Sequence, residues 1–326
     1  MDYPVDFSRK KRKWLPLLLA VMALLAGLHF TSTYYREQIN LLCGGGNQKF
    51  LAAAAVNNID AMRELLRDGQ ANADCRDKQQ WTAMHFAAHE GHAEQIAFLA
   101  GHRAPIDART NYQWTPLHWA VYQQQLSAAI TLLAHNADAN AGNMTGNTPL
   151  HLCGFNNNVN MATILLDHRA DINRRNRSGS TPLDYAVHQQ AAEMVLFLLN
   201  RGADPNSGKG AGFAGKDSQP PLARATMLGS KEMVTMLLLF HADINMADAT
   251  GNTALHEAAR LNRREIVAIL LRHQADPLRR NLAGDTPLEL CRGQEARGLM
   301  LRRVTEIVFN LNKYTDQRNI IFAAPL

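Results

Sequence analysis

The sequence has few of the residue patterns that catalysis or metal binding requires. Its 326 residues include only four cysteines, and no two of these have the Cys-x-x-Cys spacing of a zinc site. No Ser/His/Asp constellation and no pair of carboxylates suited to acid–base chemistry stands out. We therefore predict that the chain is not an enzyme and that it uses no cofactor and no metal.

The excess of positive over negative charge is also small. The net charge is +5, and residues 1–30 alone contribute +3 of it, so the rest of the chain is nearly neutral. Nucleic-acid-binding domains carry a pronounced basic footprint, and we predict no nucleic-acid partner here. The basic group Arg174, Arg175 and Arg177 is typical of a solvated loop, or of a rim facing an acidic partner.

Long apolar runs are missing except for one near the N-terminus. Residues 14–30 are 17 residues without charge, which as a helix would extend about 26 Å. A soluble buried helix is seldom apolar on every face. A cleaved signal peptide needs small residues at the cut, but cleavage after Ala26 would put Leu24 at position −3. The pattern predicts an uncleaved transmembrane signal-anchor helix at 14–30, followed by a juxtamembrane linker at 31–46.

The basic residues 9–13 predict how this helix is oriented. Cytoplasmic flanks of membrane helices carry the excess of Lys and Arg, so residues 1–13 would form a basic cytoplasmic segment. The remainder would then lie on the external side, in a periplasm or a lumen. We expect a single-pass protein of a bacterial inner membrane.

Beyond these absences, the chain contains a tetrapeptide that recurs at a fixed interval. Thr115-Pro116-Leu117-His118 returns every 33 residues, apart from one six-residue insertion. Single leucines and Ala-Asp-x-Asn turns keep the same spacing. A period between 20 and 50 residues indicates stacked supersecondary units, not one globular core. The copies begin at Thr82, Thr115, Thr148, Thr181, Pro220, Thr253 and Thr286.

Each copy reads as a pair of short helices. Thr115 suits an N-cap and Pro116 the first helical position. His118 then occupies the third position, from which its ring can reach back to Thr115 as in a capping box. A second helix follows, with Ile130, Leu132 and Leu133 on one face, and Asn136 tolerates the left-handed conformation that ends it.

This pattern resembles the ankyrin repeat, whose signature is T-P-L-H-x-A within 33 residues. The resemblance covers residues 47–311, about eight repeats with atypical end units, and leaves a C-terminal tail at 312–326. It implies an all-α ankyrin-repeat solenoid, preceded here by the one transmembrane helix. The chain departs from the pattern in two ways. The capping His or Thr is replaced at Asp184, Glu289, Pro220 and Ala223, and the usual Gly of the second turn is replaced at Arg103, Arg169, His241 and Gln274.

The resemblance also implies a function. Ankyrin arrays bind proteins on the side formed by loop tips and first helices, so we expect a membrane-anchored scaffold, adaptor or inhibitor of a protein partner. Aromatic residues are enriched at binding hot spots. In the alternative interpretation, Trp81 and Trp114 only pack neighbouring loops together. The candidate partner-binding residues are Trp81, Tyr112, Trp114, Trp119, Tyr122 and Phe155.

The histidines and cysteines have structural interpretations in this register. His85, His118, His151 and His256 fall at the capping position of separate repeats, so they are predicted to cap helices and not to bind a metal. Cys153 and Cys291 replace a small buried residue and are predicted to be too far apart to pair. Cys43 and Cys75 are predicted to be better exposed and are candidates for disulfide pairing, either within one chain or between chains.

One motif supports a second functional hypothesis. Residues 210–216 have the G-x-x-x-x-G-K spacing of a phosphate-binding loop, which would make the chain a nucleotide-responsive protein or enzyme using Lys216. However, Asp217 replaces the Ser or Thr that binds magnesium, and no apolar strand precedes the motif. The segment lies in the glycine-rich insertion 207–219. There the repeat caps are weakest, and we predict that the array divides into two cooperative blocks.

Overall fold

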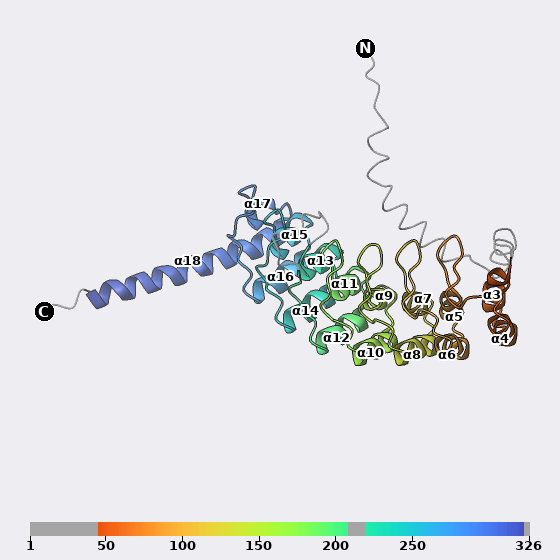
Figure 1. The fold of residues 1–326 in the computed structure, drawn as a ribbon. Coiled ribbons are helices and arrows are strands. Elements are labelled where there is room, and N and C mark those ends of the chain that lie inside the picture. Colours follow the sequence, from red (N-terminus) through yellow and green to blue (C-terminus); the bar gives the residue numbers. More distant parts are fainter. Residues whose placement is uncertain (1–44, 208–218, 323–326) are drawn as a thin grey trace, which may run out of the picture.

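The described part of the chain is a row of helix pairs. The computed structural model describes residues 45–207 and 219–322, with side chains of that part up to residue 309. Each pair stacks on the next, and loops project from one edge of the row (Figure 1). The only β pairing in the described residues is an isolated bridge between Ala247 and Thr253. The predicted all-α solenoid is therefore confirmed for these residues.

Eight helix pairs make up the described array. In the pairs before the last one, the first helix lies on the side of the projecting loops and the second lies on the opposite edge (Figure 1). In chain order the pairs are α3 (Gly46–Ala55) with α4 (Ile59–Arg67), α5 (Ala83–Glu90) with α6 (Ala93–Gly101), α7 (Pro116–Tyr122) with α8 (Leu126–Ala134), α9 (Pro149–Asn156) with α10 (Val159–Asp167), α11 (Pro182–His188) with α12 (Ala192–Asn200), α13 (Pro221–Leu228) with α14 (Lys231–Leu239), α15 (Ala254–Arg260) with α16 (Arg264–Arg272), and α17 (Pro287–Leu290) with α18 (Gln294–Phe322).

The recurring tetrapeptide begins the first helix of a pair as predicted. The Thr115 amide donates to His118 Nδ1 at 3.2 Å, and the Thr115 hydroxyl oxygen accepts from the His118 amide at 3.4 Å. The same reciprocal box forms at Thr82, Thr148, Thr181, Thr253 and Thr286. Asp184 and Glu289 replace the imidazole nitrogen with a carboxylate oxygen and keep the box.

The positions after the second helices adopt the left-handed conformation. Asn136 has φ of 64°, as predicted for a helix-ending residue. Arg103, Arg169, His241 and Gln274 have φ between 58° and 68°, although none of them is glycine. Such residues carry a small conformational cost, and the fixed repeat geometry maintains them.

Neighbouring repeats are joined by a ladder of side-chain to backbone bonds. Asn140 Oδ1 accepts from the Asp171 amide at 2.7 Å, and Asn173 Oδ1 accepts from the Asp204 amide at 2.8 Å. The ladder continues across the insertion, where Asn206 Oδ1 accepts from the Asp243 amide at 2.7 Å. The six extra residues therefore do not separate the two repeats that flank them.

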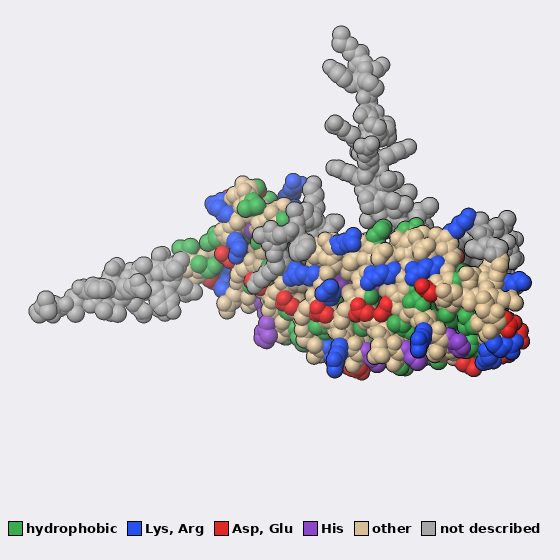
Figure 2. Space-filling model, in the orientation of Figure 1, with side chains coloured by type: hydrophobic (Ala, Val, Ile, Leu, Met, Phe, Trp, Pro, Cys, Tyr) green, Lys and Arg blue, Asp and Glu red, His purple; other side chains and the backbone are tan. Residues whose placement is uncertain are grey.

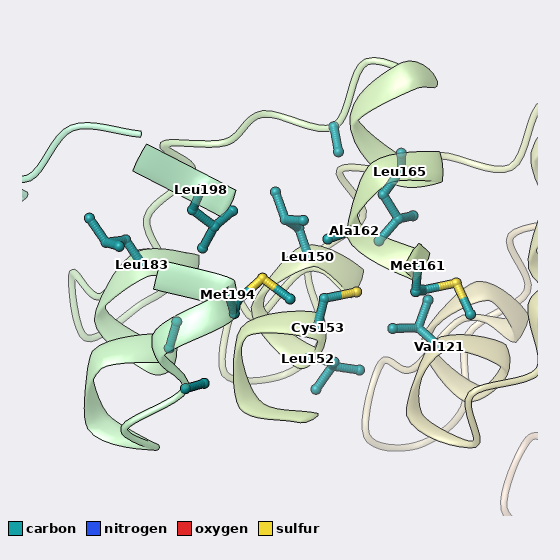
Figure 3. Close-up of a cluster of buried hydrophobic side chains, with 14 of the residues drawn as sticks. Val121, Leu150, Leu152, Cys153, Met161, Ala162, Leu165, Leu183, Met194 and Leu198 are labelled. Atoms are coloured by element: carbon teal, nitrogen blue, oxygen red, sulfur yellow. The ribbon is translucent and has the colours of Figure 1, made fainter. Parts of the chain in front are cut away.

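The core is a continuous layer between first and second helices. Leu150 and Cys153 of α9 lie against Met161 and Leu165 of α10, and Leu183 continues the layer into the next pair (Figure 3). Cys153 and Cys291 are 0% and 3% exposed, so both are buried as predicted. Ile130 does not share the buried face of Leu132 and Leu133, because it is 44% exposed on the outer side of α8.

The two ends of the array differ from the sequence prediction. Cys75 is buried and not exposed, and its thiol donates to the Asn47 carbonyl at 3.6 Å; Cys43 lies outside the described residues. At the other end α18 continues to Phe322 and leaves the array, so one helix crosses the predicted boundary at residue 311 (Figure 1).

The membrane prediction falls largely beyond the described part of the chain. The basic segment 1–13, the predicted span 14–30 and most of the linker 31–46 lie outside the described residues. Within the described ranges, no helix combines the length and the apolar character that crossing a bilayer requires.

Candidate functional site

Four of the six predicted binding residues meet in one aromatic cluster, which we define as Trp81, Trp114, Trp119 and Tyr122. The Trp119 ring, on α7, lies 4.7 Å from the ring centroids of both Trp81 and Trp114. Tyr122 meets Trp114 edge-on at 5.5 Å. Tilted and edge-on contacts at these distances are the favoured geometries of aromatic pairs. The cluster thus joins loop residues of two repeats to one first helix.

Trp81 lies at the bottom of this cluster. It is 6% exposed, whereas Trp114, Trp119 and Tyr122 are half-buried. The Trp81 amide donates to Asp77 Oδ1 at 2.7 Å, which fixes the turn that carries the ring. Burial raises the pKa of Asp77 to about 6, and bonds from backbone amides oppose that rise. Trp81 therefore supports the surface from beneath, as the alternative interpretation holds for this residue.

The other two predicted residues lie near the cluster but outside its ring contacts. Tyr112 stands on a loop tip and is 55% exposed. Its carbonyl accepts from the Met144 amide of the next loop at 3.0 Å, and Met144 is itself exposed. Phe155 is half-buried on α9, four residues after His151, as Tyr122 is four residues after His118. The surface therefore extends over three repeats.

Sequence reasoning missed two residues whose rings contact this cluster. His89 lies 5.8 Å from the Trp81 ring and 5.6 Å from the Trp119 ring. Its Nδ1 bonds to Glu90 at 2.9 Å, and this bond is the main reason why the pKa of Glu90 is lowered. Phe86 packs 5.1 Å from Trp81. Both could have been found, because they occupy the register positions of Tyr122 and Trp119 in the preceding repeat.

One polar atom of the cluster has no partner. The Trp119 Nε1–H group is buried and makes no hydrogen bond among the described residues. A buried donor without an acceptor costs stability, and in native structures each such group calls for an explanation. The cluster thus keeps an unsatisfied donor at the centre of the three repeats.

The capping histidines serve a structural purpose. His118 Nε2 donates to the Asn147 carbonyl of the next loop at 2.9 Å, so Nδ1 accepts from Thr115 and the ring is neutral. Burial lowers the pKa of His85, His118 and His151 to about 4. Their capping role is therefore confirmed. Within the described ranges, no group of three or more His, Cys, Asp or Glu side chains could hold a metal ion.

The glycine motif at residues 210–216, on which the nucleotide hypothesis depends, lies outside the described residues.

Known proteins share this architecture. The family described as Ankyrin repeats (3 copies) matches residues 50–143, 138–209 and 207–281. The solved ankyrin repeat domain of Bcl-3 superposes with a TM-score of 0.63 at 30% identity, covering 69% of this chain and 100% of that one. Bcl-3 is described there as a unique member of the IkappaB protein family.

Curated relatives match over short stretches. Neurogenic locus notch homolog protein 1 of Xenopus tropicalis is 39% identical over 74 residues, which are 23% of this chain and 3% of that protein. The BTB/POZ domain and ankyrin repeat-containing protein NOOT2 of Medicago truncatula is 48% identical over 65 residues, 19% of this chain and 13% of that protein. The chain thus spans only a small part of these relatives. Because the family match extends over most of the sequence and agrees with the observed helix pairs, the chain belongs to the ankyrin repeat family.

Proposed function

We propose that this chain binds a protein partner on the aromatic surface of its second to fourth repeats, as a scaffold, adaptor or inhibitor without chemistry of its own. The surface consists of Trp114, Trp119, Tyr122 and Phe155, with Tyr112 and Met144 at the loop tips and Trp81 beneath. Ankyrin repeats are interaction modules, and the ankyrin-containing relatives support the same class of function.

The contrast between exposed and buried aromatic rings is the observation that carries this proposal. Trp114, Trp119 and Tyr122 hold rigid positions against each other yet remain half-exposed. Rigid aromatic side chains bury a large area at a small entropic cost, which is why they dominate interface hot spots. The unpaired Trp119 Nε1–H adds a donor that a partner's acceptor would satisfy after a small ring movement.

The proposal includes a location. The basic residues 9–13 and the apolar residues 14–30 support a single-pass anchor with a cytoplasmic N-terminus and an external array. A reporter that is active only in the cytoplasm, fused after Leu326, should be silent in the intact chain. Neutral substitutions at residues 9–13 should weaken that bias, and full activity of the reporter in the native chain would show the orientation to be wrong.

The binding proposal is tested with a matched pair of loop substitutions. Trp114→Ala should weaken capture of the natural partner by about 2 kcal/mol or more, the usual scale of a hot spot. Leu282→Ala removes an apolar side chain that is 81% exposed on the last loop, and it should leave binding unchanged. Affinity would be measured by surface plasmon resonance with the full chain.

Circular dichroism separates loss of binding from loss of fold. Both variants should keep the helical content and melting temperature of the native chain, since neither residue is fully buried. If Trp114→Ala unfolds the array, Trp114 is structural. If it folds and binds normally, the aromatic surface is not the binding site.

A further inference from the structure

The positive charge of the array is concentrated at its C-terminal end. Residues 260–303 contain ten arginines, no lysine and five acidic residues. Residues 110–200, which carry most of the aromatic surface, contain four arginines and five acidic residues. Residues 260–303 are therefore a basic region, although the net charge of the whole chain is small. In Figure 2, blue side chains lie along the whole visible face of the array and also at the end from which α18 leaves.

Five of these arginines lie in or next to two adjacent turns, and we define them as the arginine edge. Arg260 ends α15, Arg263 lies in the turn that follows, and Arg264 begins α16. Arg292 lies in the turn between α17 and α18, and Arg297 lies in the first turn of α18. The two turns touch, because Arg264 bridges to Glu295 at 2.9 Å and a Cβ at Gly293 would collide with Asn262.

Three members of the arginine edge have no carboxylate partner in the described part of the chain. Arg260 pairs with the buried Glu257 at 2.6 Å, and Arg264 pairs with Glu295. In contrast, Arg263, Arg292 and Arg297 are exposed, and none of them takes part in a salt bridge between described residues. The Arg263 guanidinium packs over the preceding turn, where a Cβ at Gly229 would lie 2.8 Å from its Cζ. The Arg263 guanidinium therefore lies against Gly229 without a carboxylate partner among the described residues.

The arginine edge continues the side of the array that carries the aromatic surface. Arg260 stands four residues after His256, which is the register position of Tyr122 after His118 and Phe155 after His151. Residues at one register position of a solenoid line up along its axis. A partner that runs along the array from the aromatic surface therefore meets the arginine edge.

The composition of this end favours an acidic polypeptide as the occupant. Arginine offers a planar fork of donors that matches a carboxylate bidentately. Residues 249–303 contain no Phe, Trp or Tyr, so they offer no ring on which a nucleic-acid base could stack.

We propose that the arginine edge binds an acidic segment of a protein through the forks of Arg263, Arg292 and Arg297. In its biological setting this inference rests on the proposed function, because the segment would belong to the partner held on the aromatic surface. Exposed interface charges act mainly on association rate and salt dependence. The contact should therefore weaken steeply as salt rises.

The test uses the full chain and a fluorescent 20-residue peptide of alternating Glu and Ser, followed by fluorescence anisotropy at low and at physiological salt. The triple variant Arg263→Glu, Arg292→Glu and Arg297→Glu should weaken binding by about tenfold or more. A matched variant, Arg109→Glu, Arg174→Glu and Arg177→Glu, makes the same charge change on other exposed arginines and should change affinity less than about twofold. A peptide with Gln in place of Glu should not bind.

Further probes decide the class of ligand. Replacing the three arginines by lysine should recover only part of the affinity, since lysine lacks the fork. An oligothymidylate of 20 nucleotides and vesicles containing phosphatidylserine should bind more weakly than the peptide. Tighter binding of either through these arginines would overturn the inference, and so would equal losses in the two triple variants or no peptide binding at all.

Each of the two proposals, the proposed function and this inference, can be disproved without the other. Trp114→Ala should leave binding of the acidic peptide unchanged while weakening the natural partner. Melting curves of each variant establish that it is folded. If a triple charge-reversal variant unfolds, the corresponding Arg→Gln triple variant provides the same test with half the charge change.

Discussion

The central repeats and the C-terminal end place different residues on the same framework. Trp119 and Tyr122 follow His118 at the register positions that Glu257 and Arg260 take after His256. Both histidines make the same bonds: His118 Nε2 donates to the Asn147 carbonyl at 2.9 Å, and His256 Nε2 donates to the Asp285 carbonyl at 3.2 Å. The capping residues thus maintain the same fold in both regions, while the residues at the other register positions differ and give each region a different surface.

The turns between first and second helices differ in the same way. In the central repeats these turns are chiefly uncharged amides, such as Gln123, Gln124 and Asn157, whereas near the end they carry Arg263 and Arg264. Amides bond to the neighbouring turn: Asn156 donates to the Tyr122 carbonyl at 3.3 Å. The central turns therefore satisfy their polar groups internally, while the last turns present charge outward.

The largest expected difference between the two regions is their response to acid. His85, His118 and His151 are neutral in the fold because burial lowers their pKa to about 4, against about 6.5 when unfolded. The unfolded chain therefore binds more protons below pH 6.5. Stability should fall as pH drops from about 6.5 to about 4, by about 3 kcal/mol for each histidine.

Acidic groups whose pKa is raised by burial, namely Asp77, Asp107 and Asp184, oppose this loss. Burial raises the pKa of Asp77 to about 6, so the folded state gains a proton there before the unfolded state does, and one contribution of similar size is offset. Hydrogen exchange between pH 7 and pH 4.5 should show the helices α5–α10 losing protection before α15 and α16. Earlier opening of the C-terminal end would contradict the assignment of acid sensitivity to these caps.

A second comparison sets the two tryptophans of the loops against each other. Trp81→Ala should destabilise the array by about 3–5 kcal/mol, the range for removing a buried aromatic side chain, because this ring is 6% exposed beneath Trp119. Trp114→Ala should cost much less, since Trp114 is half-buried. Urea unfolding of both variants measures the difference, and equal losses would mean that Trp114 belongs to the core.

A third comparison sets a buried capping side chain, His118, against an exposed one, Glu289. His118→Ala should cost about 3 kcal/mol, because it opens a cavity and leaves the Asn147 carbonyl and the Thr115 amide without a partner. Glu289→Ala should cost clearly less, since its side chain is exposed and water can replace its bonds to Thr286. A larger loss at Glu289 would show that the last repeat holds the array together.

The sequence alone predicts those features that depend on local chemistry. The Thr–His box follows from residue type and spacing, since its partners lie three positions apart. The left-handed conformation of Arg103 follows from the ankyrin register, because Arg103 occupies the position where the family usually has Gly. Features that depend on a neighbouring repeat could not be predicted. Trp81 and Tyr112 look equivalent as loop aromatics, but Trp119 of the next repeat covers one and nothing described covers the other. Cys75 was predicted to be exposed because the sequence does not show that Asn47 lies over it.

The charge pattern shows the same limit for function. Averaged over the chain, the charge is close to neutral and predicts no basic surface. Only the fold brings Arg263 and Arg292 onto touching turns. The predicted aromatic residues, in contrast, came from the register of the ankyrin pattern, in which Trp81 and Trp114, and likewise Tyr122 and Phe155, lie 33 residues apart. Their role in binding stays a prediction.

The smallest effect is expected at the seam that separates the two regions. Pro220 occupies the N-cap position of α13 and makes no side-chain cap bond, and Ala223 stands where four other repeats have His. On the preceding repeat, Asp184 cannot donate to the next loop as a histidine does, and it accepts instead from the Ser207 hydroxyl at 3.1 Å. The repeat that begins at Pro220 therefore lacks a cap, and neither it nor the preceding repeat has a capping histidine that donates to the next loop.

Restoring the motif at this seam tests whether it divides the array. The double substitution Pro220→Thr and Ala223→His should stabilise the chain by about 1 kcal/mol, the typical value of an N-cap, because the new hydroxyl would accept from the helix amides and the new imidazole could donate to the Asn252 carbonyl. Without it, hydrogen exchange should show residues 46–206 and 220–311 opening separately; with it, the two opening free energies should converge. The bond from the Asp243 amide to Asn206 already joins the flanking repeats, and if the native array opens as one unit, that bond and the shared core are enough to couple them.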